Sequence, residues 1–236
     1  KDFPDKQDVL RYVLTATAPE TKDNDFTWKD FQARNNNELV AIFGNFINRV
    51  LVLTNKYYED SVPSPNEFSE IDTETLEKVK AFPATLSKSI ERYRFREASQ
   101  ELMNLARLGN KYLADEEPWK QIKTDPGRVQ TIMYVALQIS AALAIVSEPF
   151  LPWSSEKLKK MLRLKAQPWE AVERHTPLLE AAHQIGTAQL LFAKIEDTEI
   201  EQQLEKLAKS KLENTIANKI VEPQKETISF EYFSKL

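Results

Sequence analysis

The chain of 236 residues contains no cysteine and only four glycines. Without cysteine it has no disulfides and no thiolate metal sites, which is consistent with a cytosolic protein. The glycines are isolated from one another, so no glycine-rich loop can cradle a phosphate. No serine lies in a G-x-S-x-G setting, the context of an activated nucleophile in hydrolases. The sequence therefore gives no indication of a catalytic site.

Histidine is almost absent as well. His175 and His183 stand eight positions apart in an irregular region. A structural zinc site usually needs four ligands, so we interpret both as surface residues and expect no metal site. The longest apolar runs fall short of the roughly 20 residues of a membrane span, and no signal peptide is visible. We therefore expect a cytoplasmic protein without membrane contact.

The net charge is −4, which argues mildly against a nucleic-acid binder, since such proteins are often basic. It leaves open a binder that grips a few splayed bases by stacking and hydrogen bonds, because such binding needs little neutralisation of the phosphate backbone.

What the sequence does contain is helical periodicity broken by twelve prolines. This pattern predicts an all-α protein, an antiparallel helix bundle followed by a C-terminal linker helix. The expected helices cover residues 6–16, 31–58, 72–90, 96–114, 127–147, 154–164 and 198–219. Asp72 or Thr73 is expected to cap the third helix, and Pro83 to kink or split it. The helix 127–147 is apolar nearly all round, which predicts the central buried helix.

Two stretches carry candidate binding residues. In the helix 31–58, Asn45 and Arg49 are four positions apart and therefore project from one face. Trp119 follows Pro118 at or just past a helix end. Taken singly, each of the three is more often structural; together, an aromatic face, an arginine and an asparagine can hold an unstacked base. We interpret Trp28, Trp153 and Trp169 as packing residues.

Four segments carry a recognisable pattern: DFTWKDF (25–31), NELV (37–40), GNFINRV (44–50) and ADEEPWK (114–120). Together they resemble the anticodon-binding helical bundle of the methionyl-tRNA synthetase family. Residues 10–15 resemble the segment that leaves the catalytic domain of that family. Residues 177–179 and 191–196 resemble the segment after the bundle, which folds back towards that domain. Residues 228–236 resemble the first strand of an additional oligonucleotide-binding-fold domain.

The resemblance implies a piece of a longer enzyme. Residues 1–24 would connect from the catalytic domain, 25–165 would form the bundle, and 166–222 an irregular connector and linker helix. Residues 223–236 would begin the C-terminal domain. Lys1 is not an initiator methionine and the last strand-like run has only begun, so we expect an excised fragment. The missing catalytic domain would use ATP and possibly zinc, and the missing C-terminal domain would form a homodimer.

The resemblance also implies the partner, the CAU anticodon of tRNA(Met), and the roles of the candidates. Trp119 would stack on the wobble cytosine, with Pro118 fixing its loop. Asn45 and Arg49 would hydrogen-bond anticodon bases. The acids that precede this loop would repel wrong anticodons; they are Asp115, Glu116 and Glu117. From the residues alone, we interpret these three acids as solvated helix-end residues rather than as a pair for acid–base chemistry.

The run Leu86-Ser87-Lys88-Ser89 is similar to the tail of the KMSKS signature of class I synthetases. It lies in the middle of an expected amphipathic helix, and we interpret it as chance. Two alternatives stay open: the bundle of another class I synthetase, or a non-enzymatic helical scaffold for protein partners. In the scaffold, Asn45, Arg49 and Trp119 would be merely structural. The binding hypothesis requires that these three residues share one exposed patch.

Overall fold

The structure is a computed structural model that describes residues 3–21 and 23–220. It is all-α, as the periodicity predicts, and within the described residues the β-type pairing is a single bridge between Ser61 and Gln184. The helices are α1 (Gln7–Ala16), α2 (Trp28–Arg34), η1 (Asn35–Gly44), α3 (Asn45–Tyr57), α4 (Glu70–Glu91), α5 (Phe95–Glu116), α6 (Pro118–Gln121), α7 (Pro126–Val146), α8 (Pro152–Leu162), α9 (Glu170–Glu173) and α10 (Asp197–Ile220). The chain divides into two compact units, residues 1–195 and 196–236. The expected strand at 228–236 lies outside the described residues.

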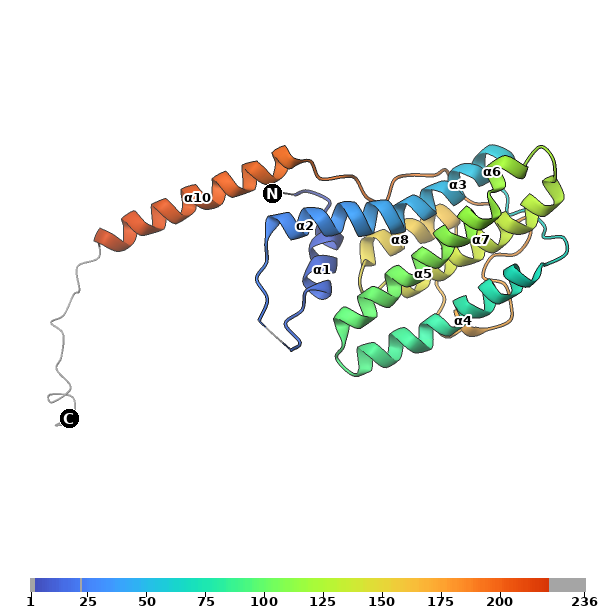
Figure 1. The fold of residues 1–236 in the computed structure, drawn as a ribbon, viewed down its shortest axis with the longest axis horizontal. Helices are drawn as coiled ribbons and strands as arrows, with labels where there is room; N and C mark the ends of the chain where they lie inside the picture. Colours follow the sequence, from blue (N-terminus) through green and yellow to red (C-terminus); the bar gives the residue numbers. More distant parts are fainter. Residues whose placement is uncertain (1–2, 22, 221–236) are drawn as a thin grey trace. The chain divides into compact units, whose positions relative to one another are not determined.

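Helix α7 is the centre of the first unit. It packs against α3, α4, α5 and α8 (Figure 1), and nearly all of its side chains are buried. Its start is as predicted: Asp125 accepts a hydrogen bond from the N–H of Arg128 at 2.9 Å, and Pro126 occupies the first helical position. One expectation needs correction, because α7 has the length and composition of a membrane span. A buried core helix meets the same criterion, and 94% of the apolar window of α7 is buried inside the protein.

The helix expected at 31–58 is a composite of three parts (Figure 1). It begins at α2, where the Thr27 hydroxyl caps the helix by accepting from the N–H of Asp30 at 3.0 Å. The middle part, η1, is a π-helix of ten residues, a wider coil whose hydrogen bonds span five residues. At its end the N–H of Asn45 bonds to the carbonyl of Val40. The sequence predicts a uniform α-helix here, and this prediction is wrong for η1.

Gly44 fits this wide coil. A Cβ at this position would lie 3.0 Å from the carbonyl oxygen of Leu39, tighter than ordinary contact. Despite the change of coil, the predicted core face of the composite helix is buried. The residues of that face with at most 1% exposure are Leu39, Phe43, Phe46, Ile47, Val50 and Leu51.

Helix α4 starts at Glu70, two residues before the expected position. Its N-cap is Ser69, and the prediction of Asp72 or Thr73 as the cap is wrong. Asp72 is instead the third helical residue of a capping box, in which its carboxylate accepts from the N–H of Ser69 at 2.9 Å. The helix continues through Pro83 without being split. It then turns at Tyr93, whose φ is 59°, and α5 runs back beside it.

Residues 189–195 form neither helix nor strand, and hydrogen bonds from Asn35 and Asn36 hold them against the composite helix. Asn36 clamps the end of this segment by bonding both the N–H and the carbonyl of Ile195, each at 2.9 Å. Asn35 donates to the carbonyl of Ala193 at 2.9 Å. Asparagines of the π-helix thus fix the path of this segment, which we call the return segment.

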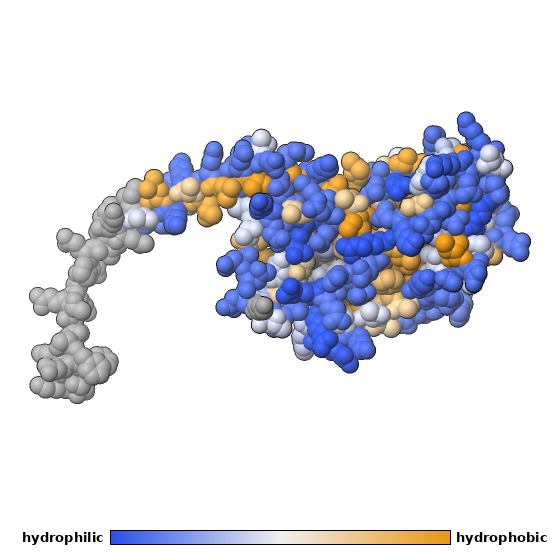
Figure 2. All heavy atoms as spheres, in the orientation of Figure 1, coloured by the Kyte–Doolittle hydropathy of each residue, from blue (hydrophilic) through white to orange (hydrophobic). Residues whose placement is uncertain are grey.

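The second unit is described by α10, which covers the predicted linker helix. Hydrophilic residues cover much of the bundle surface seen in Figure 2, while apolar residues form a band along α10. The large exposed apolar side chains of this helix are Leu204, Leu207 and Leu212.

Candidate nucleic-acid interface

The loop that carries Trp119 is a sharp helix-to-helix junction. Helix α5 ends at Glu116, and Glu117 adopts a left-handed conformation with φ of 40°. Pro118 then starts the single turn of α6, where its fixed φ suits the first helical position. Pro118 is buried, whereas Trp119 is half-buried. The junction therefore leaves the indole partly accessible on a backbone that is constrained on both sides.

Arg49 of α3 reaches this indole. Its guanidinium carbon lies 4.4 Å from the centroid of the Trp119 ring, within the range of a cation–π contact. Asn45 is exposed and lies one helical turn before Arg49 on the same helix. Two stretches that are distant in the sequence thus meet at one surface. The contact joins Arg49 to Trp119, and Asn45 extends the surface along α3.

A buried ionic network lies behind the loop and joins three helix ends. The carboxylate of Asp72, fully buried at the start of α4, accepts from both terminal nitrogens of Arg128 on α7, and the Nη2–Oδ1 distance is 2.9 Å. Arg128 also donates to Glu116 at 2.8 Å. Tyr112 donates its hydroxyl to Asp72 at 2.5 Å. The ends of α5 and α7 are therefore held against α4 next to Trp119.

The charges of this network are stabilised by one another. Burial opposes ionisation of Asp72, but hydrogen bonds from Arg128, Tyr112 and Ser69 outweigh it, and the pKa of Asp72 lies below its usual value. The bond to Asp72 raises the pKa of Arg128. Burial, reinforced by the bond to Asp72, raises the pKa of Tyr112. At neutral pH Asp72 is therefore ionised, Arg128 is protonated and Tyr112 is a neutral phenol.

The three acids that precede the loop differ from one another. Asp115 pairs with Lys111 at 2.5 Å and Glu117 with Lys120 at 2.7 Å, and both carboxylates are well exposed, as expected for helix-end residues. Glu116 does not fit this expectation, because only 15% of its side chain is exposed and it pairs with Arg128. Glu116 therefore belongs to the network that holds the loop.

The other tryptophans are placed differently. Trp28 packs within an aromatic cluster with Phe3, Phe26 and Phe31, as predicted. Trp153 is 60% exposed, and its interpretation as a packing residue is wrong. It lines an apolar groove of about 710 Å³ together with side chains of α1 and the start of α5. The amphipathic pattern correctly marked an apolar face, but no other part of the described chain covers this part of it.

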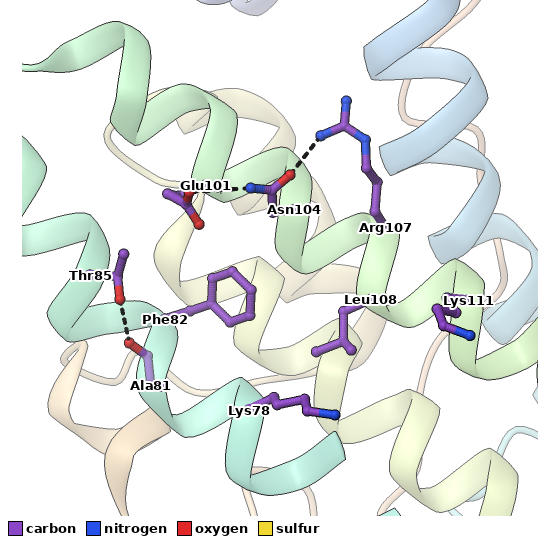
Figure 3. Close-up of a pocket in the computed structure, with 9 residues that line it drawn as sticks. All are labelled: Lys78, Ala81, Phe82, Thr85, Glu101, Asn104, Arg107, Leu108 and Lys111. Carbon is purple, nitrogen blue, oxygen red and sulfur yellow. Dashed lines mark hydrogen bonds between the residues drawn. The ribbon is translucent and has the colours of Figure 1, made fainter. Parts of the chain in front are cut away.

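A second groove, of about 550 Å³, runs between α4 and α5 (Figure 3). Phe82 and Leu108 project between the helices, and the polar residues around them pair with one another. Asn104 donates to Glu101 at 3.2 Å and accepts from Arg107 at 2.9 Å. The polar groups of this groove are thus already satisfied by the protein and do not converge on a ligand.

The remaining sequence features have structural roles. His175 lies 2.7 Å from the Lys80 ammonium, and His183 contacts the carbonyl of Leu162 at 2.8 Å. Within the described residues, no three acidic or histidine side chains are grouped so that they could hold a metal ion. The run 86–89 lies inside α4, where Leu86 and Ser89 are buried. It is a segment of the bundle, as interpreted.

Comparison with known proteins decides the family. Residues 62–211 match the family model described as the anticodon binding domain of methionyl tRNA ligase, and residues 2–51 match that of class I tRNA synthetases (M). The chain belongs to the methionyl-tRNA ligase family. Trp119 falls in the first match, and Asn45 and Arg49 fall in the second, so the Arg49–Trp119 contact joins segments that two family models cover.

The whole chain is 64% identical to part of the methionine–tRNA ligase of Flavobacterium psychrophilum, of which it covers 34%. It is also 64% identical to part of the ligase of Christiangramia forsetii, of which it covers 35%. The chain thus spans about a third of the length of the curated relatives that it matches. The crystal structure of free methionyl-tRNA synthetase from Mycobacterium tuberculosis shares the fold, with a TM-score of 0.74 at 22% identity, over 80% of this chain and 39% of that one. The predicted all-α bundle of this family is confirmed.

Proposed function

We propose that this chain recognises the CAU anticodon of tRNA(Met), with the wobble cytosine stacked on Trp119. The observation that supports it is the Arg49 guanidinium, 4.4 Å from the centroid of a half-buried indole ring. An aromatic face and a planar donor side by side match the needs of an unstacked base, which offers a π-face and a hydrogen-bonding edge. Stacking of one base on an aromatic side chain is worth about 1–3 kcal/mol.

In the proposed mechanism Arg49 changes its role when tRNA binds. In the free protein the guanidinium covers the indole. A cytosine that takes this place leaves Arg49 free to donate to the edges of the bases, while Asn45 offers one donor and one acceptor group. Pro118 limits the motion of the loop, and the network of Arg128 limits that of the helix ends. The platform is therefore preorganised, which lowers the entropic cost of binding.

The three acids beside the loop have two different roles in this proposal. Asp115 and Glu117 remain candidates for repelling wrong anticodons, because 40% and 42% of their side chains are exposed. The carboxylate of Glu116 is engaged by Arg128 and acts on the loop rather than on RNA.

For the whole protein we propose methionine–tRNA ligase activity in the cytoplasm. The remaining two thirds would supply the ATP site, possibly with zinc, and would form a homodimer through the C-terminal domain. The family match favours this over another class I synthetase. A protein scaffold is disfavoured because Trp119 is accessible and not a buried core residue.

The test uses full-length enzyme and two tRNA(Met) transcripts, one with CAU and one with the wobble cytosine changed. Trp119→Ala should erase most of the difference in affinity, whereas Trp119→Phe, which keeps an aromatic face, should retain most of it. If the alanine variant discriminates as well as the parent, the site is assigned wrongly. Transfer of CAU into a non-cognate tRNA separates this proposal from another synthetase, since only a methionyl enzyme gains affinity.

A further inference from the structure

A hollow of about 330 Å³ lies beside Asn45, between the composite helix and the return segment. Gly44, Asn45 and Asn48 line it from the helix, and Leu190, Phe192 and Lys194 from the return segment. Its size is at the lower end of pockets that hold small ligands, roughly 300–1,000 Å³.

The walls of the hollow are held in place by interactions outside it. The return segment is fixed by Asn35 and Asn36, and Lys157 donates to the carbonyl of Leu190 at 2.8 Å. The ring of Phe192 packs edge-on against that of Phe43, with the centroids 6.0 Å apart. The hollow is therefore a formed feature of the free protein.

Gly44 leaves the hollow open because it has no side chain to fill it. A Cβ there would point at the Phe192 ring, 3.5 Å from its Cδ2 atom, and would be close to the Leu39 carbonyl. The absence of a side chain at this position leaves room where the π-helix meets the return segment.

The polar groups of the hollow are unused. Within the described residues, the side chains of Asn45, Asn48 and Lys194 have no hydrogen bond or ion pair. In contrast, Asn35, Asn36 and Asn55 of the same helical run all bond to the backbone or to another side chain. Leu190, 65% exposed, adds an apolar edge. Two free amides, a free ammonium and an apolar wall match the base edge, the phosphate and the face of one nucleotide.

The hollow adjoins the proposed anticodon surface. Asn45 belongs to both, and Asn48 is three residues further along the same helix, so the two amides are neighbours. Arg49 lies four residues, about 6 Å along the axis, beyond Asn45. At about 100° per residue, Arg49 and Asn48 project on opposite sides of Asn45 around the helix axis, so Asn45 lies between the Trp119 surface and the hollow.

We propose that this hollow binds the third base of the anticodon, the uracil of CAU, with Asn48 on the base edge and Lys194 on a flanking phosphate. This inference rests on the proposed function and deepens it. The wobble base occupies Trp119, the middle base lies over Asn45, and the third base enters the hollow. The return segment then contributes directly to anticodon specificity.

The experiment uses full-length enzyme and tRNA(Met) transcripts carrying CAU, CAC or UAU. Asn48→Ala should reduce the preference for CAU over CAC about tenfold, because an amide that reads a base edge contributes discrimination of roughly that size. The preference for CAU over UAU should stay within about twofold. Asn37→Ala is the matched control, since Asn37 is exposed on the same helical run outside the hollow.

Lys194→Gln tests the phosphate contact separately. It should lower the affinity for all three transcripts by the same factor. It should also reduce the slope of log affinity against log salt by about one. Lys165→Gln, at an exposed lysine elsewhere in the same unit, should leave the slope unchanged.

Failure of this inference is distinguishable from failure of the proposed function. If Asn48→Ala keeps the CAU over CAC preference, or weakens all transcripts equally, the hollow is not a base site. If Lys194→Gln leaves the salt slope unchanged, Lys194 does not contact a phosphate. If Trp119→Ala still abolishes wobble discrimination in either case, the proposed function stands and only the hollow is reassigned.

Discussion

The guanidinium of Arg49 lies over the indole of Trp119, although the two residues belong to helices far apart in the sequence, α3 and α6. The contact depends on two rigid supports. Arg49 belongs to α3, whose opposite face is packed in the core, and Trp119 belongs to the one-turn helix α6, which follows the α5 end that Arg128 holds through Glu116. The surface is thus set by packing and ionic contacts behind it, and the predictions below separate these contributions.

Replacement of Arg49 by lysine should weaken binding of tRNA by the full-length enzyme about fivefold to thirtyfold. An ammonium keeps the charge but lacks the planar, forked donors that meet a base edge in the complex, and a bidentate contact to a base edge contributes about 1–3 kcal/mol. The measurement is the dissociation constant for the CAU transcript. Lys56→Gln, which removes the contact of Lys56 with Tyr57, is the control and should have no effect. Equal affinities of Arg49→Lys and the parent would show that charge alone suffices.

Replacement of Arg128 by methionine should destabilise the 236-residue chain by about 3–5 kcal/mol, because Asp72 and Glu116 would keep buried charges without a partner. Urea unfolding followed by circular dichroism measures the change. Lys78→Gln is the matched surface control: its pair with Glu74 is 60% and 56% exposed and should contribute about 0–1 kcal/mol. A loss below 1 kcal/mol for the Arg128 variant would mean that the helix ends are held by apolar packing.

Acid should weaken the fold through Asp72. Its pKa is lowered in the folded chain, so its stabilising contribution is fully present above the unfolded value of about 3.9 and is lost as the pH falls through the lower folded value. Between these two values the unfolded chain binds more protons, and stability therefore rises with pH. Urea midpoints measured from pH 2.5 to pH 6 should show this slope, and Asp72→Asn should flatten it. If the urea midpoint of the asparagine variant depends on pH as steeply as that of the parent, other carboxylates cause the loss of stability in acid.

Alanine at Gly109 should destabilise the chain by about 1–2 kcal/mol in spite of its better helix propensity. Its Cβ would lie 2.5 Å from two atoms of the Phe46 ring, which is fully buried and has no room to withdraw. Overpacking of a core costs about 1–3 kcal/mol, and the propensity gain of up to about 1 kcal/mol offsets only part of it. Adding Phe46→Leu should recover stability in the Gly109→Ala background, and a double-mutant cycle would show the coupling. If Gly109→Ala is more stable than the parent, the Phe46 ring does not lie against Gly109.

The parts of the fold that follow from local chemistry were predictable. The start of α7 at Asp125-Pro126 and its burial follow from a cap and an apolar run. The cap of α4 could also have been found, because Ser69 and Asp72 have the spacing of a capping box; both residue types favour caps, and the pattern was assigned one turn too late. The exposure of Trp153 could not be found, since periodicity marks an apolar face but not what covers it.

The candidate binding site, unlike the helices, does not follow from local sequence patterns alone. Helical spacing places Asn45 and Arg49 on one face, but nothing in the spacing brings Trp119 to them. That expectation came from the family resemblance, and the structure shows the Arg49–Trp119 contact itself. The hollow was missed because its walls come from a helix and an irregular segment far along the chain. Its local signal in the sequence is the pair of asparagines that follows the π-helix, Asn45 and Asn48.

The π-helix has a further consequence for how this protein can vary. Each residue of an α-helix advances the chain by about 100° around the axis. Deletion of one residue from η1 would therefore swing α3 by more than a quarter turn, point Arg49 away from the indole and carry Phe46 towards water. Insertion would do the same in the opposite sense. The ten residues of η1 therefore fix the direction, around the helix axis, in which every side chain of α3 projects.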